Sequence, residues 1–182
     1  YVSFADVTRP EAAQTMSRLH KLGVKHLVMI SGDRKPIADE VAQQVGIDEV
    51  YAEQLPVDKI NIIRNRAKDE RPVIMVGDGV NDAPSLTAAD AGIAMGAHGA
   101  TAASESADVV ILRDDLGKVA DAVKISRDTM RIAREAVLIG IAICTILMVI
   151  AAFGVIPAII GAMFQEVVDT VTILYALRAR NG

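Results

Sequence analysis

Residues 73–84 have the sequence Val73-Ile-Met-Val-Gly-Asp-Gly-Val-Asn-Asp-Ala-Pro84. The apolar run ends at Gly77, which is typical of a buried strand in a parallel sheet. Two carboxylates, Asp78 and Asp82, follow four residues apart, and Pro84 suits the first turn of a helix. This order predicts a site at the carboxyl end of a sheet, and paired carboxylates suit a hard cation such as Mg²⁺. The alternative is an acidic turn in which an aspartate caps the helix.

The composition excludes several classes of protein. Apolar residues make up 52% of the 182 residues, and the mean hydropathy of +0.34 indicates a membrane part. The net charge is −4, aromatic residues are 3%, and no basic patch with interleaved aromatics is present, so nucleic acid is not an expected partner. One cysteine, Cys144, excludes an internal disulfide framework, and no secretion signal is found. Because the chain starts at Tyr1, inside a strand-like segment, we expect a fragment of a longer protein.

Strand-like and helix-like segments alternate over residues 1–126. Short apolar runs predict strands, and amphipathic segments between them predict helices. Strands are expected at residues 1–7, 26–30, 49–52, 73–77, 91–95 and 108–112, and helices at 10–22, 34–45 and 57–67. Strands interleaved with helices of this length predict an α/β fold with a doubly wound parallel sheet. We take residues 1–126 as one domain.

Residues 127–182 are expected to form a transmembrane hairpin. A long helical pattern starts at Leu116, and residues 136–156 carry no charge over a length that can cross a bilayer. A second mostly apolar stretch covers residues 158–177. Arginines flank the pair at both ends, at positions 127, 131, 134, 178 and 180. The positive-inside rule then predicts an integral membrane protein with both termini in the cytoplasm. A buried hairpin of a soluble protein is the alternative.

Four motifs in this order resemble the carboxyl-terminal half of the phosphorylation domain of P-type ATPases. They are Ser31-Gly-Asp33, Leu55-Pro-Val-Asp-Lys59, Met75–Pro84 and Ala88-Ala-Asp-Ala-Gly-Ile-Ala-Met-Gly96. The final membrane pair and the Ala-Leu-Arg ending are similar to the heavy-metal-transporting branch. The resemblance implies a haloacid-dehalogenase-like fold, Mg²⁺ and ATP as cofactors, and an aspartyl-phosphate cycle that drives cation export across the lipid bilayer. Further domains of the same polypeptide are implied as partners.

The resemblance also implies roles for residues before the acidic loop. Ser31 would donate its hydroxyl to a phosphoryl oxygen, at a position where the family usually has Thr, and Gly32 would allow close backbone approach. Asp33 corresponds to the acid near the nucleotide, and it would also cap the helix expected at 34–45. Lys59 corresponds to the lysine that faces the phosphoryl group and ATP, although a solvated lysine would also suit this helix.

In the loop itself, the resemblance assigns Asp78 as a direct ligand of Mg²⁺. Asp82 would complete or orient the coordination shell, and Asn81 would hydrogen-bond the phosphoryl group or the loop. Phosphoryl transfer depends on neutralising the charge spread over the phosphoryl oxygens, which these residues suit.

The family's nucleophile string, Asp-Lys-Thr-Gly-Thr, is absent from this sequence. Asp6 is the nearest candidate, but Arg9-Pro10 follow it as in a scaffold segment of the family. We therefore expect the nucleophile outside these residues, so that the fragment alone is inactive. Two alternatives stay open: a membrane-tethered phosphatase of the haloacid-dehalogenase type that uses Asp6, and a non-catalytic regulatory fragment.

Ionisable groups in the second apolar stretch predict the transported-ion site, because such groups are costly at membrane depth. Glu166 and Asp169 are three residues apart and are expected to share a helix face, next to Gln165. Cys144 in the first stretch is a further candidate, although a small packing residue would also fit. These oxygen-rich ligands favour zinc, cobalt or a similar divalent ion over copper.

Overall fold

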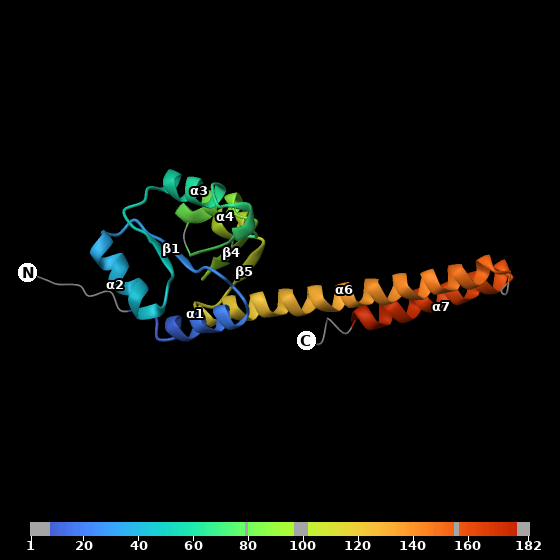
Figure 1. Ribbon diagram of the computed structural model, residues 1–182. Helices are drawn as coiled ribbons and strands as arrows, with labels where there is room; N and C mark the ends of the chain where they lie inside the picture. The colour runs from blue at the N-terminus through green and yellow to red at the C-terminus, as the bar shows by residue number, and fades with distance from the viewer. Residues whose placement is uncertain (1–7, 79, 97–101, 155–156, 178–182) are drawn as a thin grey trace, which may run out of the picture. The chain divides into compact units, whose positions relative to one another are not determined.

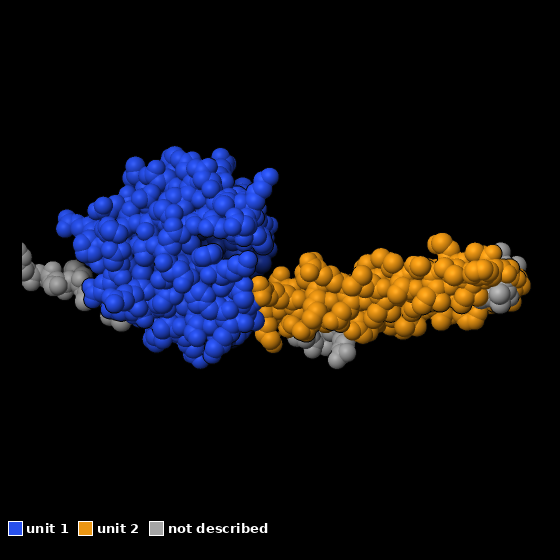
Figure 2. Space-filling view, in the orientation of Figure 1, with its two compact units in different colours: residues 1–123 blue, residues 124–182 orange. Residues whose placement is uncertain are grey.

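The computed structural model describes residues 8–78, 80–96, 102–154 and 157–177 (Figure 1). The chain divides into two compact units, residues 1–123 and residues 124–182, which are coloured separately in Figure 2. The strand expected at residues 1–7, together with Asp6, lies outside the described residues. The domain boundary expected at residue 126 stays a prediction.

The first unit alternates short parallel strands with helices. Its elements are α1 (Ala12–Lys21), β1 (Val28–Ile30), α2 (Lys35–Val45), β2 (Glu49–Tyr51), α3 (Pro56–Arg64), η1 (Lys68–Glu70), β3 (Ile74–Gly77), η2 (Val80–Asp82), α4 (Ala83–Ala88), β4 (Ala91–Met95), α5 (Ala102–Ser106) and β5 (Val109–Ile111). All strand pairs are parallel, as the alternating pattern predicts. The α/β fold class is confirmed.

The strands form two separate groups among the described residues. One group is β1 paired with β2, and the other has the order β3-β4-β5. In the second group, Val76 of β3 lies opposite Ile93 of β4. The sequence predicts one sheet, whereas β1 and β3 each have one strand neighbour here. This difference matters for the site, because both strands end in loops with predicted functional residues.

The core of the first unit packs α4 and the start of α6 (Gly117–Ala152) against the strands. Leu86 of α4 and Ala94 of β4 are both buried and form one cluster. Ile93, Met95 and Ile111 form another, together with Val119. Gly92 lets α4 approach β4 closely, because a Cβ atom there would lie 3.0 Å from the carbonyl oxygen of Leu86. The acidic loop between β3 and α4 is therefore anchored on both sides by packed elements.

The second unit is a helical hairpin. It contains most of α6 (Gly117–Ala152) and all of α7 (Ala158–Ala176), which run side by side in Figure 1. Many of its large apolar side chains are exposed. Within the described residues, α6 is the helix that is long and apolar enough to cross a membrane. The second span predicted at 158–177 coincides with α7 and stays a prediction.

Replacing Leu86 with Ala tests the packing of α4 on β4. The side chain of Leu86 is 1% exposed, so we expect Leu86→Ala to lower the free energy of unfolding of the first unit by about 2–5 kcal/mol. Leu112→Ala is the control, since Leu112 is 66% exposed, and we expect a change within about 0.5 kcal/mol. Hydrogen exchange of β4 amides at increasing urea concentration measures both. Equal effects of the two substitutions would contradict this account of the core.

Candidate functional site

Lys59 and Asp82 form an ion pair at the carboxyl end of β3. The Nζ atom of Lys59 donates to Oδ1 of Asp82 over 2.9 Å. Their side chains are 20% and 14% exposed, so water screens this pair less than a surface pair. The two residues are 23 positions apart in the chain. The structure thus brings together two residues that the sequence assigns to the same phosphoryl site.

Gly77 makes room for Asp82. A Cβ atom at position 77 would lie 2.7 Å from Cβ of Asp82 and 3.0 Å from its Oδ2 atom. Side-chain carbon atoms do not approach that closely, so any larger residue would push Asp82 away from the end of β3. The sequence identifies Gly77 only as the residue that ends a strand. Its second role, to leave space for the side chain of Asp82, follows from the fold.

The start of α3 holds Lys59 in place. Pro56 occupies the first turn, which suits its fixed φ and its missing N–H. The carboxylate of Asp58 accepts a hydrogen bond of 3.1 Å from the backbone N–H of Leu55. This contact fixes the first turn of the helix, as acidic groups at a helix N-terminus do. Lys59 therefore extends from an ordered turn toward Asp82.

Ser31 and Asp33 form a second local cluster, after β1. The hydroxyl of Ser31 donates to Oδ2 of Asp33 over 2.5 Å, and the backbone N–H of Asp33 donates to Oγ of Ser31 over 3.1 Å. The sequence predicts that Asp33 also caps the following helix, but Asp33 is not the cap of α2. The cap position is Arg34, without a side-chain hydrogen bond. The carboxylate of Asp33 is turned toward Ser31 instead.

The loop after β2 supports the loop after β1. The backbone N–H of Gln54 donates to the carbonyl of Ser31, and that of Glu53 donates to the carbonyl of Asp33, each over 2.9 Å. Glu53 has a φ of +58°, a conformation that few residues other than glycine adopt. Gly32 lies close to this loop, since a Cβ atom added at position 32 would lie 3.5 Å from the carbonyl oxygen of Gln54. The chain then enters α3, which carries Lys59.

Asp78 and Asn81 are exposed to solvent. Asp78 is near enough to Arg9 to favour its charged form. Arg9 itself pairs with Asp114 over 2.6 Å, and this hydrogen bond is the main reason that the pKa of Arg9 is raised. The carboxylate of Asp78 is accessible to a ligand, and it lies at the same strand end as Asp82.

The predicted residues thus form two groups. Lys59 contacts Asp82, and Ser31 contacts Asp33, but no hydrogen bond or ion pair joins the two groups among the described residues. Ser31 and Asp33 follow the carboxyl end of β1, and Asp82, to which Lys59 of α3 is paired, follows that of β3. Parallel α/β folds bind their ligands at such loop ends. The position of the two groups supports one site.

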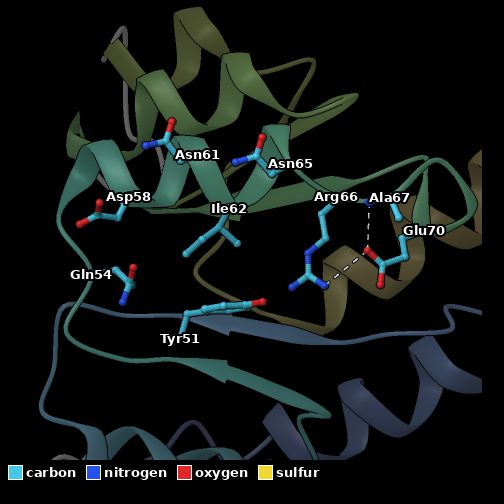
Figure 3. Close-up of a pocket in the computed structure, with 9 residues that line it drawn as sticks. All are labelled: Tyr51, Gln54, Asp58, Asn61, Ile62, Asn65, Arg66, Ala67 and Glu70. Carbon is cyan, nitrogen blue, oxygen red and sulfur yellow. Dashed lines mark hydrogen bonds and ion pairs between the residues drawn. The ribbon is translucent and has the colours of Figure 1, made fainter.

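A separate cavity of about 460 Å³ lies between β2 and α3 (Figure 3). Arg66 extends from the end of α3, over the ring of Tyr51 at 5.4 Å, and pairs with Glu49 at 2.7 Å. The hydroxyl of Tyr51 and the guanidinium of Arg66 both bind the carboxylate of Glu49 and lower its pKa. These groups satisfy one another, and none of the predicted site residues lines the cavity. The contacts among Glu49, Tyr51 and Arg66 connect β2 to the segment that follows α3. The cavity is distinct from the candidate site.

Polar side chains connect α6 and α7 in the second unit. The thiol of Cys144 donates to Oε1 of Gln165 over 3.2 Å, and Nε2 of Gln165 donates to Oδ1 of Asp169 over 3.2 Å. Three of the predicted ion-site residues are therefore connected. Glu166 is exposed and takes no part in this series of contacts. Within the described residues, no group of three or more His, Cys, Asp or Glu side chains is arranged to hold a metal.

A second polar contact between these helices is not predicted from the sequence. The hydroxyl of Tyr175 donates to Oε2 of Glu135 over 2.9 Å. Between the two polar contacts, Gly140 faces Thr172, whose Oγ1 would be 3.7 Å from a Cβ atom at position 140. Small residues at such a position let two helices approach closely. A sequence signal existed in Glu135, the last charged residue before the apolar stretch, but its partner depends on the register of the hairpin.

Comparison with known proteins shows which proteins the chain resembles. The family model of haloacid dehalogenase-like hydrolases matches residues 1–90. The manganese-exporting P-type ATPase of Mycobacterium leprae is 40% identical over 165 residues, which are 91% of this chain and 23% of that protein. The cadmium, zinc and cobalt-transporting ATPase of Bacillus subtilis is 37% identical over 169 residues, which are 91% of this chain and 24% of that protein. The chain thus spans about a quarter of the length of these curated relatives.

A solved structure agrees with these relatives. The crystal structure of a zinc-transporting PIB-type ATPase in the E2.Pi state matches with a TM-score of 0.86 and 31% identity, over 96% of this chain and 28% of that one. Sequence, family model and structure lead to the same group of proteins. The chain is homologous to a part of the heavy-metal-transporting P-type ATPases, and its first unit has their haloacid-dehalogenase-like fold.

Proposed function

We propose that this chain is part of an ATP-driven exporter of a divalent heavy-metal ion that works through an aspartyl-phosphate. The observation that carries the proposal is the Lys59–Asp82 pair, held at the end of β3 above Gly77. The named relatives are transporters, which favours transport over a tethered phosphatase that uses Asp6 or a regulatory fragment. The complete activity belongs to a longer polypeptide, since the chain spans about a quarter of its relatives.

The donor set at the acidic loop fits Mg²⁺. Asp78 and Asp82 provide carboxylate oxygens and no sulfur or imidazole, which is the chemistry that Mg²⁺ prefers. Asp78 is accessible, and Asp82 has Oδ1 directed at Lys59, which leaves Oδ2 for the metal shell. Bound there, Mg²⁺ supplies positive charge that offsets the charge of the phosphoryl oxygens.

Each of the predicted site residues has a defined role in this proposal. Lys59 supplies a compact positive charge for the phosphoryl group, and Asp82 holds its Nζ atom in position. Ser31 supplies a hydroxyl, which donates to Asp33 in this structure. Asn81 lies exposed in the same loop and offers amide groups to the phosphoryl oxygens or to the loop. Asp33 lies on the side of the loop proposed to face ATP.

We propose that the phosphate-accepting aspartate arrives on another strand. β1 and β3 each have one neighbour among the described strands, and each leads into one of the two groups of site residues. A parallel strand between them would place its carboxyl end between Ser31 and Lys59. A nucleophile at that strand end would face both groups at once. This arrangement also explains why the isolated chain is proposed to be inactive.

The second unit is proposed to carry the cargo through the membrane, with α6 and α7 as two spans and both termini in the cytoplasm. Cys144, Gln165 and Asp169 would contact the transported ion, and Glu166 would join them on rotation of its side chain. The donors include a thiol as well as oxygens. This set suits zinc, cobalt, cadmium or manganese, the ions for which the relatives are named.

Gly77→Ala should slow phosphoenzyme formation from ATP in the full-length protein by on the order of 10²-fold, because its Cβ would displace Asp82 and with it Lys59. Gly92→Ala is the matched control, since its Cβ would disturb the packing of Leu86 but not the site. Incorporation of radiolabelled phosphate measures both. If both variants lose phosphorylation equally, a general loss of stability explains the effect and the role of Gly77 is refuted.

Lys59→Met should reduce phosphoenzyme formation by about 10²–10³-fold, because the positive charge that faces the phosphoryl oxygens is lost. Lys59→Arg should not restore it, since a planar guanidinium does not fit the place of a compact ammonium. Lys35→Met is the control, because Lys35 pairs with Asp39 on the exposed surface of α2. The proposal fails if Lys59→Met is phosphorylated at the rate of the control.

Asp169→Asn and Glu166→Ala should each abolish stimulation of ATP hydrolysis by the transported ion, because a carboxylate ligand is lost. Cys144→Ser should weaken stimulation by cadmium more than by manganese, since thiolates favour softer ions. Thr145→Ser is the control, as the hydroxyl of Thr145 binds the backbone of its own helix. Titration of full-length protein with each metal gives the answer for every variant. Unchanged stimulation in any one variant removes that residue from the ion path.

A further inference from the structure

The start of the membrane hairpin carries a row of arginines on one face of α6. Arg127, Arg131 and Arg134 are separated by four and three residues, which places them on the same side of the helix. Leu138 follows Arg134 by four residues and continues this row. The face thus changes from cationic to apolar within one helical turn.

A hollow of about 480 Å³ lies along this row. Its lining includes the three arginines with Met130, Glu135 and Leu138. Met130 and Leu138 are both more than half exposed. Guanidinium groups and the apolar side chains of Met130 and Leu138 thus line the same hollow, which suits a phospholipid, whose phosphate adjoins its acyl chains.

The charge of this segment is positive after its internal pairs are counted. Residues 124–135 contain four basic and two acidic side chains. Asp128 pairs with Arg131 over 3.1 Å and with Lys124 over 4.0 Å, while Glu135 accepts the hydroxyl of Tyr175. Arg134 forms no ion pair or hydrogen bond with any residue in the described part of the chain. Its guanidinium is therefore available at the level where the charged part of α6 ends.

The opposing helix does not cover this face. α7 contacts α6 through Gly140 and Cys144, which lie on a different side of α6 from Arg134 and Leu138, and through Tyr175, which binds Glu135 of the hollow's lining. Further along the arginine row, Ile141 and Met148 are exposed. Arginine binds phosphate through two parallel N–H groups, and cationic clusters at the cytoplasmic end of a membrane helix attract anionic lipids.

We propose that Arg127, Arg131 and Arg134 bind the phosphate headgroup of an anionic phospholipid, whose acyl chains lie against Leu138 and the apolar face below it. The inference rests on the proposed function only in that α6 crosses a membrane. A zwitterionic lipid has the same phosphate but carries a compensating cation, so the site should prefer phosphatidylglycerol to phosphatidylcholine.

Native mass spectrometry of the full-length protein in detergent, with equimolar phosphatidylglycerol and phosphatidylcholine, tests the proposal. The wild type should retain phosphatidylglycerol with about tenfold preference, and the triple variant Arg127→Gln, Arg131→Gln, Arg134→Gln should bind both lipids equally. The matched control removes three exposed charges elsewhere, with Lys25→Gln, Arg64→Gln and Arg113→Gln. It should keep the wild-type preference.

Several outcomes would overturn the proposal. A wild type without lipid preference would mean that other parts of the polypeptide cover the face, and a triple variant that keeps the preference would place the lipid elsewhere. Displacement of the lipid by inorganic phosphate would indicate a site for free anions. If the triple variant does not fold, Arg134→Gln alone should lower the preference by about fivefold, and no change would refute the site. Lipid binding is measured without ATP or metal, so a failure of phosphorylation leaves this result readable.

Discussion

The contact between Lys59 and Asp82 is the interaction on which the candidate site depends. It joins α3 to the loop after β3 and brings a cation and a carboxylate to one strand end. A partly buried ion pair adds little to stability, because desolvation of both charges offsets their attraction. Its value lies in position. The pair holds an ammonium group in place after β3, and the missing Cβ of Gly77 allows that geometry.

Much of the fold could be predicted from the sequence because its signals are local. The apolar run before Gly77 gives β3, the proline at position 84 lies at the start of α4, and the long helical pattern after Leu116 gives α6. The positions of Lys59, Asp78 and Asp82 follow from motif spacing. Their contacts do not, because they depend on how α3 and α4 pack against the sheet.

Two features show the limit of local reasoning. Asp33 has the right residue type and position for a helix cap, yet its carboxylate binds the hydroxyl of Ser31, a competing local partner. Glu166 and Asp169 share a predicted face, but the contact that forms joins Asp169 to Gln165 and on to Cys144. Such pairings depend on side-chain rotamers and on the register of α6 against α7, neither of which is written in residue spacing.

The two strand groups have a consequence for the protein during its synthesis. β1 and β3 each leave one side of their backbone without a strand partner among the described residues. Unpaired strand edges are templates on which another chain can add. During synthesis, a segment that carries these edges would be protected once the proposed further strand had joined them. The strand that is proposed to deliver the phosphate acceptor would therefore also cover these edges and prevent aggregation. The same strand would then complete the catalytic site and keep the protein soluble.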